Sequence, residues 1–251
     1  MTVCHVLRED PDLAEAIDPA RRERAIGACV ARSVWIPRGR WSVSRVEGLS
    51  EGIGLLVLQG LLLRSVGIEG RFGAELLGEG DLLRPWQGED AQPTLTLTTG
   101  WRVLAPARVA LLDEAAARRF ADFPELTGRL VARALDRARN LAINMAIVHQ
   151  ARVNTRLQML FWHLADRWGR VRSEGVILPL ALTHTVLADL VAARRPTVTT
   201  ALTELARQRL VLPTSDGWLL SGEPPGELLE LQEVVIPAVC SGPPPAPDYG
   251  R

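Results

Sequence analysis

The pattern of apolar and polar positions divides the chain into parts with different periods. Through residues 1–30 apolar residues recur at helical intervals, which predicts helix. From Ser33 the chain breaks into short β-prone runs separated by Gly, Pro and Asp, and "TLTLTT" alternates with a period of two. This spacing of turn signals predicts an antiparallel barrel or jelly roll that fills the first half of the chain.

Near Ala115 the helical period returns. The stretch from Pro124 to about Val153 has no glycine after Gly128 and no further proline, so we expect one helix of about 30 residues, roughly 45 Å long. A helix of this length packs on a partner helix or connects two domains. Its apolar stripe, which lies either on a second copy or on the molecule's own sheet, comprises Leu130, Ala134, Leu141, Met145 and Val148.

The third part alternates short elements in a recognisable order. An amphipathic helix closed by Gly169 precedes the β-prone run "GVILPLAL", and two helices and a hairpin around Ser215-Asp216-Gly217 follow. Thr183 is a suitable N-cap for the first of the two helices, and Pro196 suits the first turn of the second. The order predicts a winged helix-turn-helix, in which the second helix enters the DNA major groove.

The two faces of the second helix of this motif carry different kinds of residue. Val198, Ala201, Leu202 and Leu205 recur at helical spacing and would hold the helix on its domain. An arginine such as Arg195 can bind guanine through two hydrogen bonds, and threonines can contact phosphates, bases or a thymine methyl group. The alternative is a solvated face whose arginines pair with nearby acids. The residues left facing outward are Arg194, Arg195, Thr197, Thr199, Thr200 and Thr203.

Charge supports a nucleic-acid partner only locally. The net charge is zero, with 29 basic and 29 acidic residues, and every basic residue is arginine. From Arg152 to Leu212 there are nine arginines and four acids, an excess of five positive charges. The field that matters for DNA is the local one, so overall neutrality weakens this hypothesis without excluding it.

Residues 153–221 resemble the DNA-binding domain of the cyclic-AMP receptor protein and fumarate–nitrate regulator (Crp/Fnr) family. The resemblance rests on "ILPLALTHTVLADLVAARRPTVTTALTELARQRLV". It implies an α+β fold with a jelly-roll sensor domain, a dimerisation helix and a C-terminal winged helix. It also implies a homodimer on double-stranded DNA, RNA polymerase as a further partner, base contact by Arg195, and DNA-backbone contacts by Thr183 and His184.

The sequence departs from the cyclic-AMP-binding members of that family. Gly80 and Asp81 are kept, but no Gly-Glu element follows Leu83, and Thr98-Thr99-Gly100 replaces the expected Arg-(Ser/Thr)-Ala. Leu141 and Ala142 stand where those members present hydroxyl groups. We therefore expect no cyclic-AMP binding and no cofactor, with the effector, if there is one, unidentified. Trp41, Trp86 and Trp101 are candidates for lining a barrel cavity.

Other classes of function receive little support. The three cysteines are far apart, and neither His149 nor His163 has a ligand partner four residues on, so we expect no metal site. We see no convincing catalytic motif, no membrane span and no secretion signal, and we expect a cytoplasmic protein that is not an enzyme. The boundaries we predict are 1–123, 124–152, 153–222 and a C-terminal extension 223–251 with a disordered Pro-rich tail. The leading hypothesis is a transcription regulator, and the alternative is a scaffold whose winged helix binds protein.

Overall fold

The computed structural model describes residues 2–42, 52–69, 71–85 and 97–224. It begins with a strand where the sequence predicted helix, because Thr2–His5 (β1) pairs antiparallel with Val30–Ile36 (β2). Three short helices follow β1 in the region predicted as helix: Val6–Glu9 (α1), Pro11–Glu15 (α2) and Pro19–Ala28 (α3). Asp10 and Asp18 cap α2 and α3 through their carboxylates, and these caps interrupt the helical run.

The predicted β-rich region forms one antiparallel sheet in the order β1-β2-β7-β4-β5. Two strands of 15 residues, Gly54–Ile68 (β4) and Thr98–Leu112 (β7), lie side by side along its centre. The shorter strands are Gly39–Trp41 (β3) and Leu82–Leu83 (β6), which pair with β7 and β4, and Arg71–Leu77 (β5). Much of the "TLTLTT" run, Trp86 and the segment 43–51 lie outside the described residues.

The sheet is bent where β4 and β7 change register. The shifts fall between Val57 and Leu62, and Gly60 lies among them with φ +101°. A Cβ atom at Gly60 would lie 2.4 Å from the carbonyl oxygen of Pro106. Glycine is therefore required here, because the two backbones approach too closely for a side chain and the φ angle is one that other residues rarely adopt.

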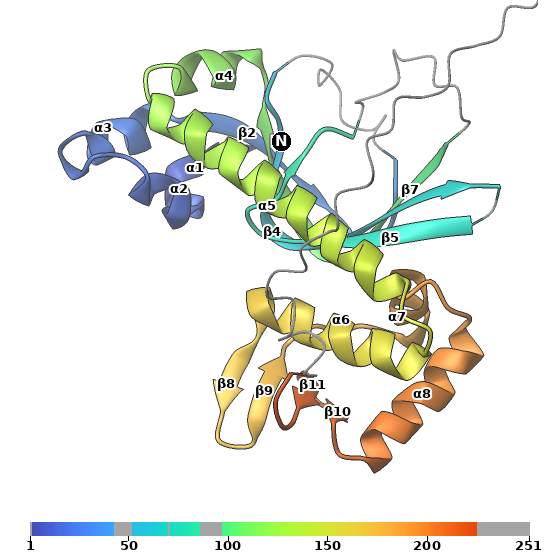
Figure 1. Cartoon of the computed structure of the whole chain (residues 1–251). Helices are drawn as coiled ribbons and strands as arrows, with labels where there is room; N and C mark the ends of the chain where they lie inside the picture. Colours follow the sequence, from blue (N-terminus) through green and yellow to red (C-terminus); the bar gives the residue numbers. More distant parts are fainter. Residues whose placement is uncertain (1, 43–51, 70, 86–96, 225–251) are drawn as a thin grey trace, which may run out of the picture.

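A short helix, Glu114–Phe120 (α4), leads into the long helix Pro124–Val148 (α5), which crosses the face of the sheet (Figure 1). The long helix has 25 residues, so it is shorter than the sequence predicted. Its end is set by local hydrogen bonds that carry no apolar signal: Gln150 donates its backbone N–H to Ile147, and Arg156 donates from Nε to the carbonyl of Gln150 at 2.6 Å. Arg152 is extended and starts the next helix.

The C-terminal part is the predicted winged helix-turn-helix. Its helices are Val153–Trp168 (α6), His184–Leu190 (α7) and Arg195–Arg207 (α8). Its strands form a sheet in the order β10-β11-β9-β8, with bounds Arg170–Arg172 (β8), Gly175–Leu178 (β9), Val211–Thr214 (β10) and Gly217–Leu220 (β11). β8 was not predicted, because its three residues are all exposed and give no alternating pattern.

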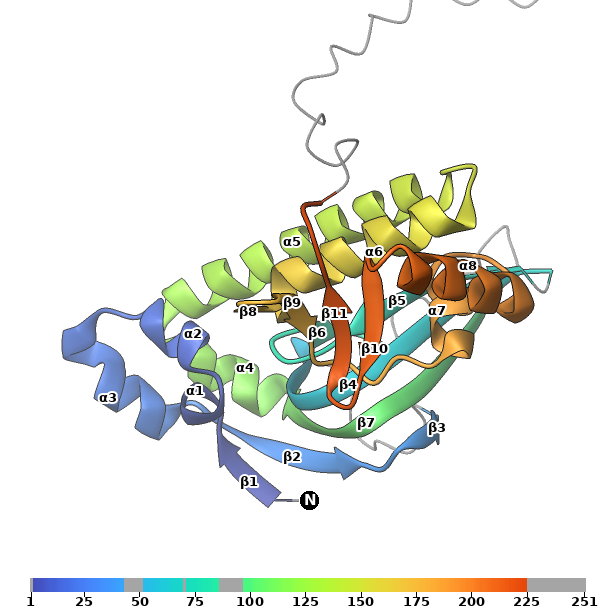
Figure 2. The ribbon, with the colours of Figure 1, turned by 90° about the horizontal axis from the view of Figure 1, so that it is seen from below.

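The winged helix packs directly on the sheet domain of its own chain. One buried cluster joins Leu61, Leu63 and Leu76 of β4 and β5 to the apolar residues of α6, α7 and α8. Adjacent residues of β4 face opposite sides: Leu62 belongs to a separate cluster inside the sheet. Figure 2 shows α5 and α6 running side by side above the curved sheet. The predicted α+β class, with an antiparallel sensor-type sheet and a C-terminal winged helix, is confirmed.

No helix among the described residues has the length and apolar character that a membrane crossing requires. The predicted C-terminal extension from residue 225 onward lies outside the described residues.

Candidate nucleic-acid interface

One face of helix α8 is buried against its own domain, and the other face is exposed to solvent. Val198, Ala201, Leu202 and Leu205 are all buried in the cluster they share with α6 and α7. The turn before α8 places Ala192 in the left-handed region, with φ +49°, and this reversal sets α8 across α7. Arg194, which caps α8, and the predicted contact residues Arg195, Thr197, Thr199, Thr200 and Thr203 are exposed.

Among the residues that the structure describes, the two arginines at the start of α8 have no acidic partner. Among the described residues, no carboxylate lies within ion-pair distance of Arg194 or Arg195, and neither guanidinium donates a hydrogen bond there. Arg207, at the other end of α8, is held by Glu204 at 2.7 Å. The hypothesis that the first two arginines pair with nearby acids thus finds no support in the structure, and both are free to bind an anion or a base edge.

The threonine hydroxyl groups of α8 are already used as donors. Thr199, Thr200 and Thr203 donate to the carbonyl oxygens of Arg195, Pro196 and Thr199 at 3.1, 3.2 and 3.0 Å. A hydroxyl has one proton and two lone pairs. In this arrangement the threonines therefore offer acceptors and methyl groups outward, which suits base amino groups and thymine methyls better than phosphates.

Two further predicted residues lie at the start of α7. Thr183 is its N-cap, with Oγ1 accepting from the N–H of Val186 at 3.3 Å, as the sequence predicted. His184 is partly buried, and its Nδ1 lies 3.0 Å from Thr199 Oγ1 on α8. The structure thus brings His184 of α7 and Thr199 of α8, both predicted contact residues, together across the turn.

The sequence interpretation missed one residue that braces the turn. Arg156 of α6 donates to the carbonyl oxygens of Gln150 and Val191, at 2.6 and 3.2 Å. It therefore fixes the end of α7 to the start of α6. A single arginine on a polar helix face gives no signal for this role, because its partners are backbone carbonyls.

The apolar stripe of α5 is divided between two environments. Leu130 is 4% exposed and packs with Phe120, Phe123 and Leu126 of the same chain. Leu141 and Val148 are partly buried beside Arg64 and Ala74, around a cavity of about 240 Å³. Ala134 and Met145 are exposed, and Met145 lies at the rim of that cavity.

The exposed face of α5 is apolar and regular. Val131, Leu135 and Met145 are 53%, 66% and 63% exposed. With the exposed alanines Ala138 and Ala142 they are spaced by four, three, four and three residues, which is the heptad spacing of a coiled-coil seam. Sequence reasoning found the helix and its apolar stripe. Which of these residues form an interface between two chains stays a prediction.

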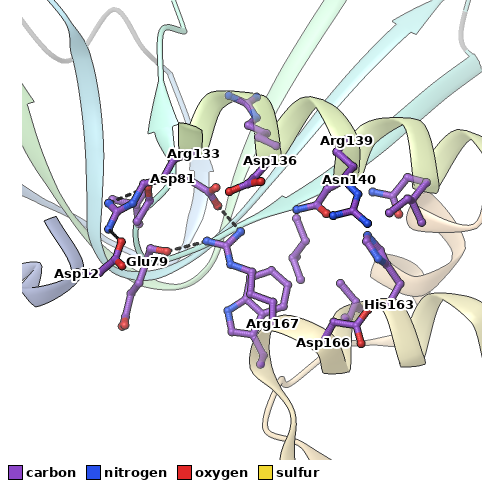
Figure 3. A pocket seen from close by; sticks show the side chains of 18 of the residues that line it. Asp12, Glu79, Asp81, Arg133, Asp136, Arg139, Asn140, His163, Asp166 and Arg167 are labelled. Carbon is purple, nitrogen blue, oxygen red and sulfur yellow. Dashed lines mark hydrogen bonds and ion pairs between the residues drawn. The ribbon is translucent and has the colours of Figure 1, made fainter. Parts of the chain in front are cut away.

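The opposite face of α5 borders a charged cavity of about 660 Å³ between the sheet domain, α5 and α6 (Figure 3). On one side Arg133 binds Asp10 at 2.6 Å and Asp12 at 2.5 Å. Arg167 of α6 bridges to the sheet domain, donating to Asp81 at 2.9 Å and to the carbonyl of Glu79 at 2.6 Å. Burial raises the pKa of Asp81, against the opposing effect of Arg167.

A second ion pair links the winged helix to the sheet. Arg102 of β7 donates to Asp189 of α7 at 2.8 Å, and both side chains are more than a third exposed. Together with the Arg167–Asp81 pair, it lies at the edge of the apolar contact between the two domains. The Arg102–Asp189 pair fixes the orientation of the winged helix more than it stabilises it, because exposed pairs contribute little free energy.

The other sequence-predicted sites have simpler surroundings. Trp41 and Trp101 pack edge to face, with ring centroids 5.5 Å apart, and Trp86 lies outside the described residues. Burial lowers the pKa of His163. Within residues 2–42, 52–69, 71–85 and 97–224, no group of histidine, cysteine and carboxylate side chains is arranged to hold a metal ion. Cys4 and Cys29 are buried free thiols.

Comparison with known proteins supports the same assignment. Residues 155–220 match the family model described as a Crp-like helix-turn-helix domain. No curated protein sequence matches the chain. Among solved structures, a cyclic nucleotide-binding domain containing protein from Listeria monocytogenes EGD-e has a TM-score of 0.62 at 13% identity, over 84% of this chain and 96% of that one.

Two further solved structures also share the fold. CooA from Carboxydothermus hydrogenoformans, solved as a mutant, has a TM-score of 0.58 at 15% identity, over 80% of this chain and 87% of that one. The c-di-GMP-responsive global regulator CLP from Xanthomonas campestris has a TM-score of 0.55 at 16% identity, over 82% of this chain and all of its own. The predicted resemblance is therefore confirmed: this chain carries a Crp-like helix-turn-helix domain, and its fold is shared with these solved structures.

Proposed function

We propose that the protein is a sequence-specific DNA-binding transcription regulator that acts as a homodimer on a palindromic operator. The observation that carries the proposal is the exposed face of α8. Two arginines with no acidic partner in the described part of the chain begin this helix, and its other face is buried. Helix α8 would lie in the major groove with its N-terminal residues against base edges. RNA polymerase as a further partner and a cytoplasmic location belong to the same proposal.

The proposal gives each candidate contact residue a role. Arg195 would bind guanine O6 and N7, and Arg194 would bind a base or a neighbouring phosphate. Thr200 and Thr203 would accept from base amino groups or contact a thymine methyl, because their protons are used within α8. Thr197 and Thr199 would complete the base-contacting surface, while Thr183 and His184 would contact the DNA backbone.

The homodimer would form along the exposed face of α5. The stripe of five apolar residues at heptad spacing is long enough to pack against the same stripe of a second α5. This symmetric contact would place the two α8 helices about 34 Å apart, which is one turn of DNA. Ala134 and Met145 of the predicted seam lie on this face. Leu141 and Val148 flank it, and Leu130 supports it from inside the chain.

We propose that cyclic AMP is not the effector. The clamp expected from the cyclic-AMP-binding members is missing from the sequence, and Asp81, which the resemblance retains, is bound to the N–H of Gly78 and to Arg167. Of the solved relatives, CLP is described as c-di-GMP-responsive, but that property is its own. A titration calorimetry experiment with cyclic AMP should give no saturable heat.

The proposal is tested by selecting fragments of genomic DNA with the purified protein at about 150 mM salt, a condition that weakens non-specific phosphate binding. The Arg195→Ala variant is run beside Arg207→Ala, which removes an exposed arginine from the same helix. We expect a palindromic motif with the wild type and Arg207→Ala, and its loss with Arg195→Ala.

Equal, weak and salt-sensitive recovery of all fragments by the three proteins would contradict the proposal. In that case, retention of a protein partner by Arg195→Ala would favour the alternative, a scaffold whose winged helix binds protein.

A further inference from the structure

His184 and Thr199 share a chain of hydrogen bonds whose direction can be worked out. His184 Nδ1 lies 3.0 Å from Thr199 Oγ1, and Thr199 Oγ1 lies 3.1 Å from the carbonyl oxygen of Arg195. The carbonyl can only accept, so it takes the single proton of the threonine hydroxyl. Both contacts are hydrogen bonds at once only if Nδ1–H of His184 donates to Thr199.

This direction fixes what the other ring nitrogen can do. In a neutral imidazole one nitrogen is a donor and the other an acceptor. With the proton of neutral His184 held on Nδ1, its Nε2 carries a lone pair, which repels the oxygens of a phosphate. Protonation gives Nε2 a proton and the ring a positive charge, and the same atom then becomes a charge-assisted phosphate donor.

Within the described residues, the charged groups around α7 leave the His184 ring without an anionic partner of its own. On α8, Glu204 is held by Arg207, and Arg195 is a cation near the same turn, as is Arg194 before it. On β5, which also packs on α7, Glu75 is held by Arg64 and Arg137. On α7 itself, Asp189 is held by Arg102. An incoming phosphate is therefore the anion that can stabilise the imidazolium.

We infer that His184 contacts a DNA phosphate only in its protonated form, so that operator binding takes up protons and strengthens as the pH falls. The inference rests on the proposed function, since it requires DNA on the α7–α8 surface. His184 is also a positioning residue for α8, because its Nδ1–H fixes the orientation of the Thr199 hydroxyl. The protein would then bind its operator most tightly in acidified conditions.

The direct test measures the dissociation constant for the selected operator from pH 5.5 to 8.5 at constant ionic strength. For the wild type we expect about tenfold tighter binding at pH 6 than at pH 8, with up to two protons taken up per dimer, one for each His184. Proton uptake is measured by calorimetry in buffers of different ionisation enthalpy. In His184→Gln the dissociation constant should stay weak at every pH, and in His184→Arg it should stay tight at every pH.

A second measurement does not need DNA. Nitrogen-15 chemical shifts of the His184 ring in the free protein at pH 8 should show the Nδ1–H tautomer, and Thr199→Val should release that preference. Three results would each overturn this inference and leave the proposed function standing. They are specific binding whose dissociation constant does not change with pH in the wild type, the same pH dependence in His184→Gln, and an Nε2–H tautomer of His184 at pH 8. Absence of operator binding at every pH would overturn the proposed function together with it.

Discussion

Arg194 and Arg195 lie at the start of α8, and no acidic partner for them is found among the described residues, whereas other arginines of the chain are bound to carboxylates or carbonyls. Arg133, Arg137 and Arg167, for example, each hold a carboxylate of the sheet domain. A guanidinium without an internal partner loses no ion pair when it binds DNA. The free energy of its new hydrogen bonds is therefore available to recognition, and this distinguishes the two arginines from the paired ones.

Replacing Arg195 with alanine should weaken operator binding by about 30-fold or more, because one bidentate contact with guanine contributes roughly 1–3 kcal/mol and a dimer on two half-sites loses two of them. Fluorescence anisotropy gives the dissociation constants for the operator and for a scrambled duplex. The effect should appear only with the operator. An equal loss on both duplexes would instead place Arg195 on a phosphate, and Arg207→Ala should change neither value by more than about twofold.

At the scale of elements, α5 separates two surfaces. One face is charged and tied to the sheet domain through Arg129, Arg133 and Arg137, and the other is apolar and exposed. Hydrogen bonds from Arg129, aided by those from Arg133, lower the pKa of Asp12 despite some burial. Asp12 therefore links α2 to α5, so that the N-terminal helices form part of the support of α5.

Placing a charge on the exposed face of α5 should produce monomers. In any dimer formed through this face, Leu135→Arg would bury one guanidinium against the same guanidinium of the second chain. The dissociation constant of the dimer should therefore rise by at least about tenfold. Val171→Arg is the matched control, because Val171 is 85% exposed on β8 and away from α5. Analytical ultracentrifugation gives the dissociation constants. A Leu135→Arg dimer as tight as the control would place the interface elsewhere.

The link between α2 and α5 should weaken in acid. Because the pKa of Asp12 is lower in the folded state than in the unfolded chain, its contribution to stability is present above the unfolded value, near pH 4, and disappears as the pH falls through the lowered value. Urea unfolding should show Asp12→Asn less stable than the wild type at pH 7, with the difference shrinking in acid. A difference that stays constant with pH would show that the carboxylate charge has no role.

At the scale of the whole molecule, the winged helix is docked on its own sheet domain. The alternation of β4 places Leu63 in the interdomain cluster and Leu62 inside the sheet. The sequence predicted the winged helix well, because Thr183, Pro196 and the spacing of Val198 to Leu205 are local signals. It could not predict the docking, because the run "LLVLQGLLL" is apolar on both faces and does not reveal which neighbour covers each.

The same limit explains the other differences. β1 forms through pairing with residues about 30 positions away, and a pattern within four residues does not show that. The end of α5 depends on hydrogen bonds to Gln150. The candidate contact residues of α8 were accessible to sequence reasoning because a helix N-terminus, a proline and a buried stripe place them. The partnership of His184 with Thr199 spans two elements and required the structure.

Leu62→Ala and Leu63→Ala should separate folding from docking. Both side chains are fully or almost fully buried, so each replacement should cost about 2–5 kcal/mol of unfolding free energy. Only Leu63→Ala should loosen the winged helix, seen as faster hydrogen exchange in β5, α7 and residues 149–152 while the interior of the sheet stays protected. Equal exchange profiles for the two variants would show that the interdomain contact is not a separate structural unit.

The central claim is that two copies of this chain place α8 in successive major grooves of one operator. Hydroxyl-radical and guanine-methylation footprinting of the selected operator tests it most directly, with the wild type, Arg195→Ala and Leu135→Arg compared at matched concentrations. We predict two protected guanine clusters about 34 Å apart, or one helical turn, the loss of both with Arg195→Ala, and weak occupancy with Leu135→Arg. A single protected half-site, or guanine protection unchanged in Arg195→Ala, would contradict this account.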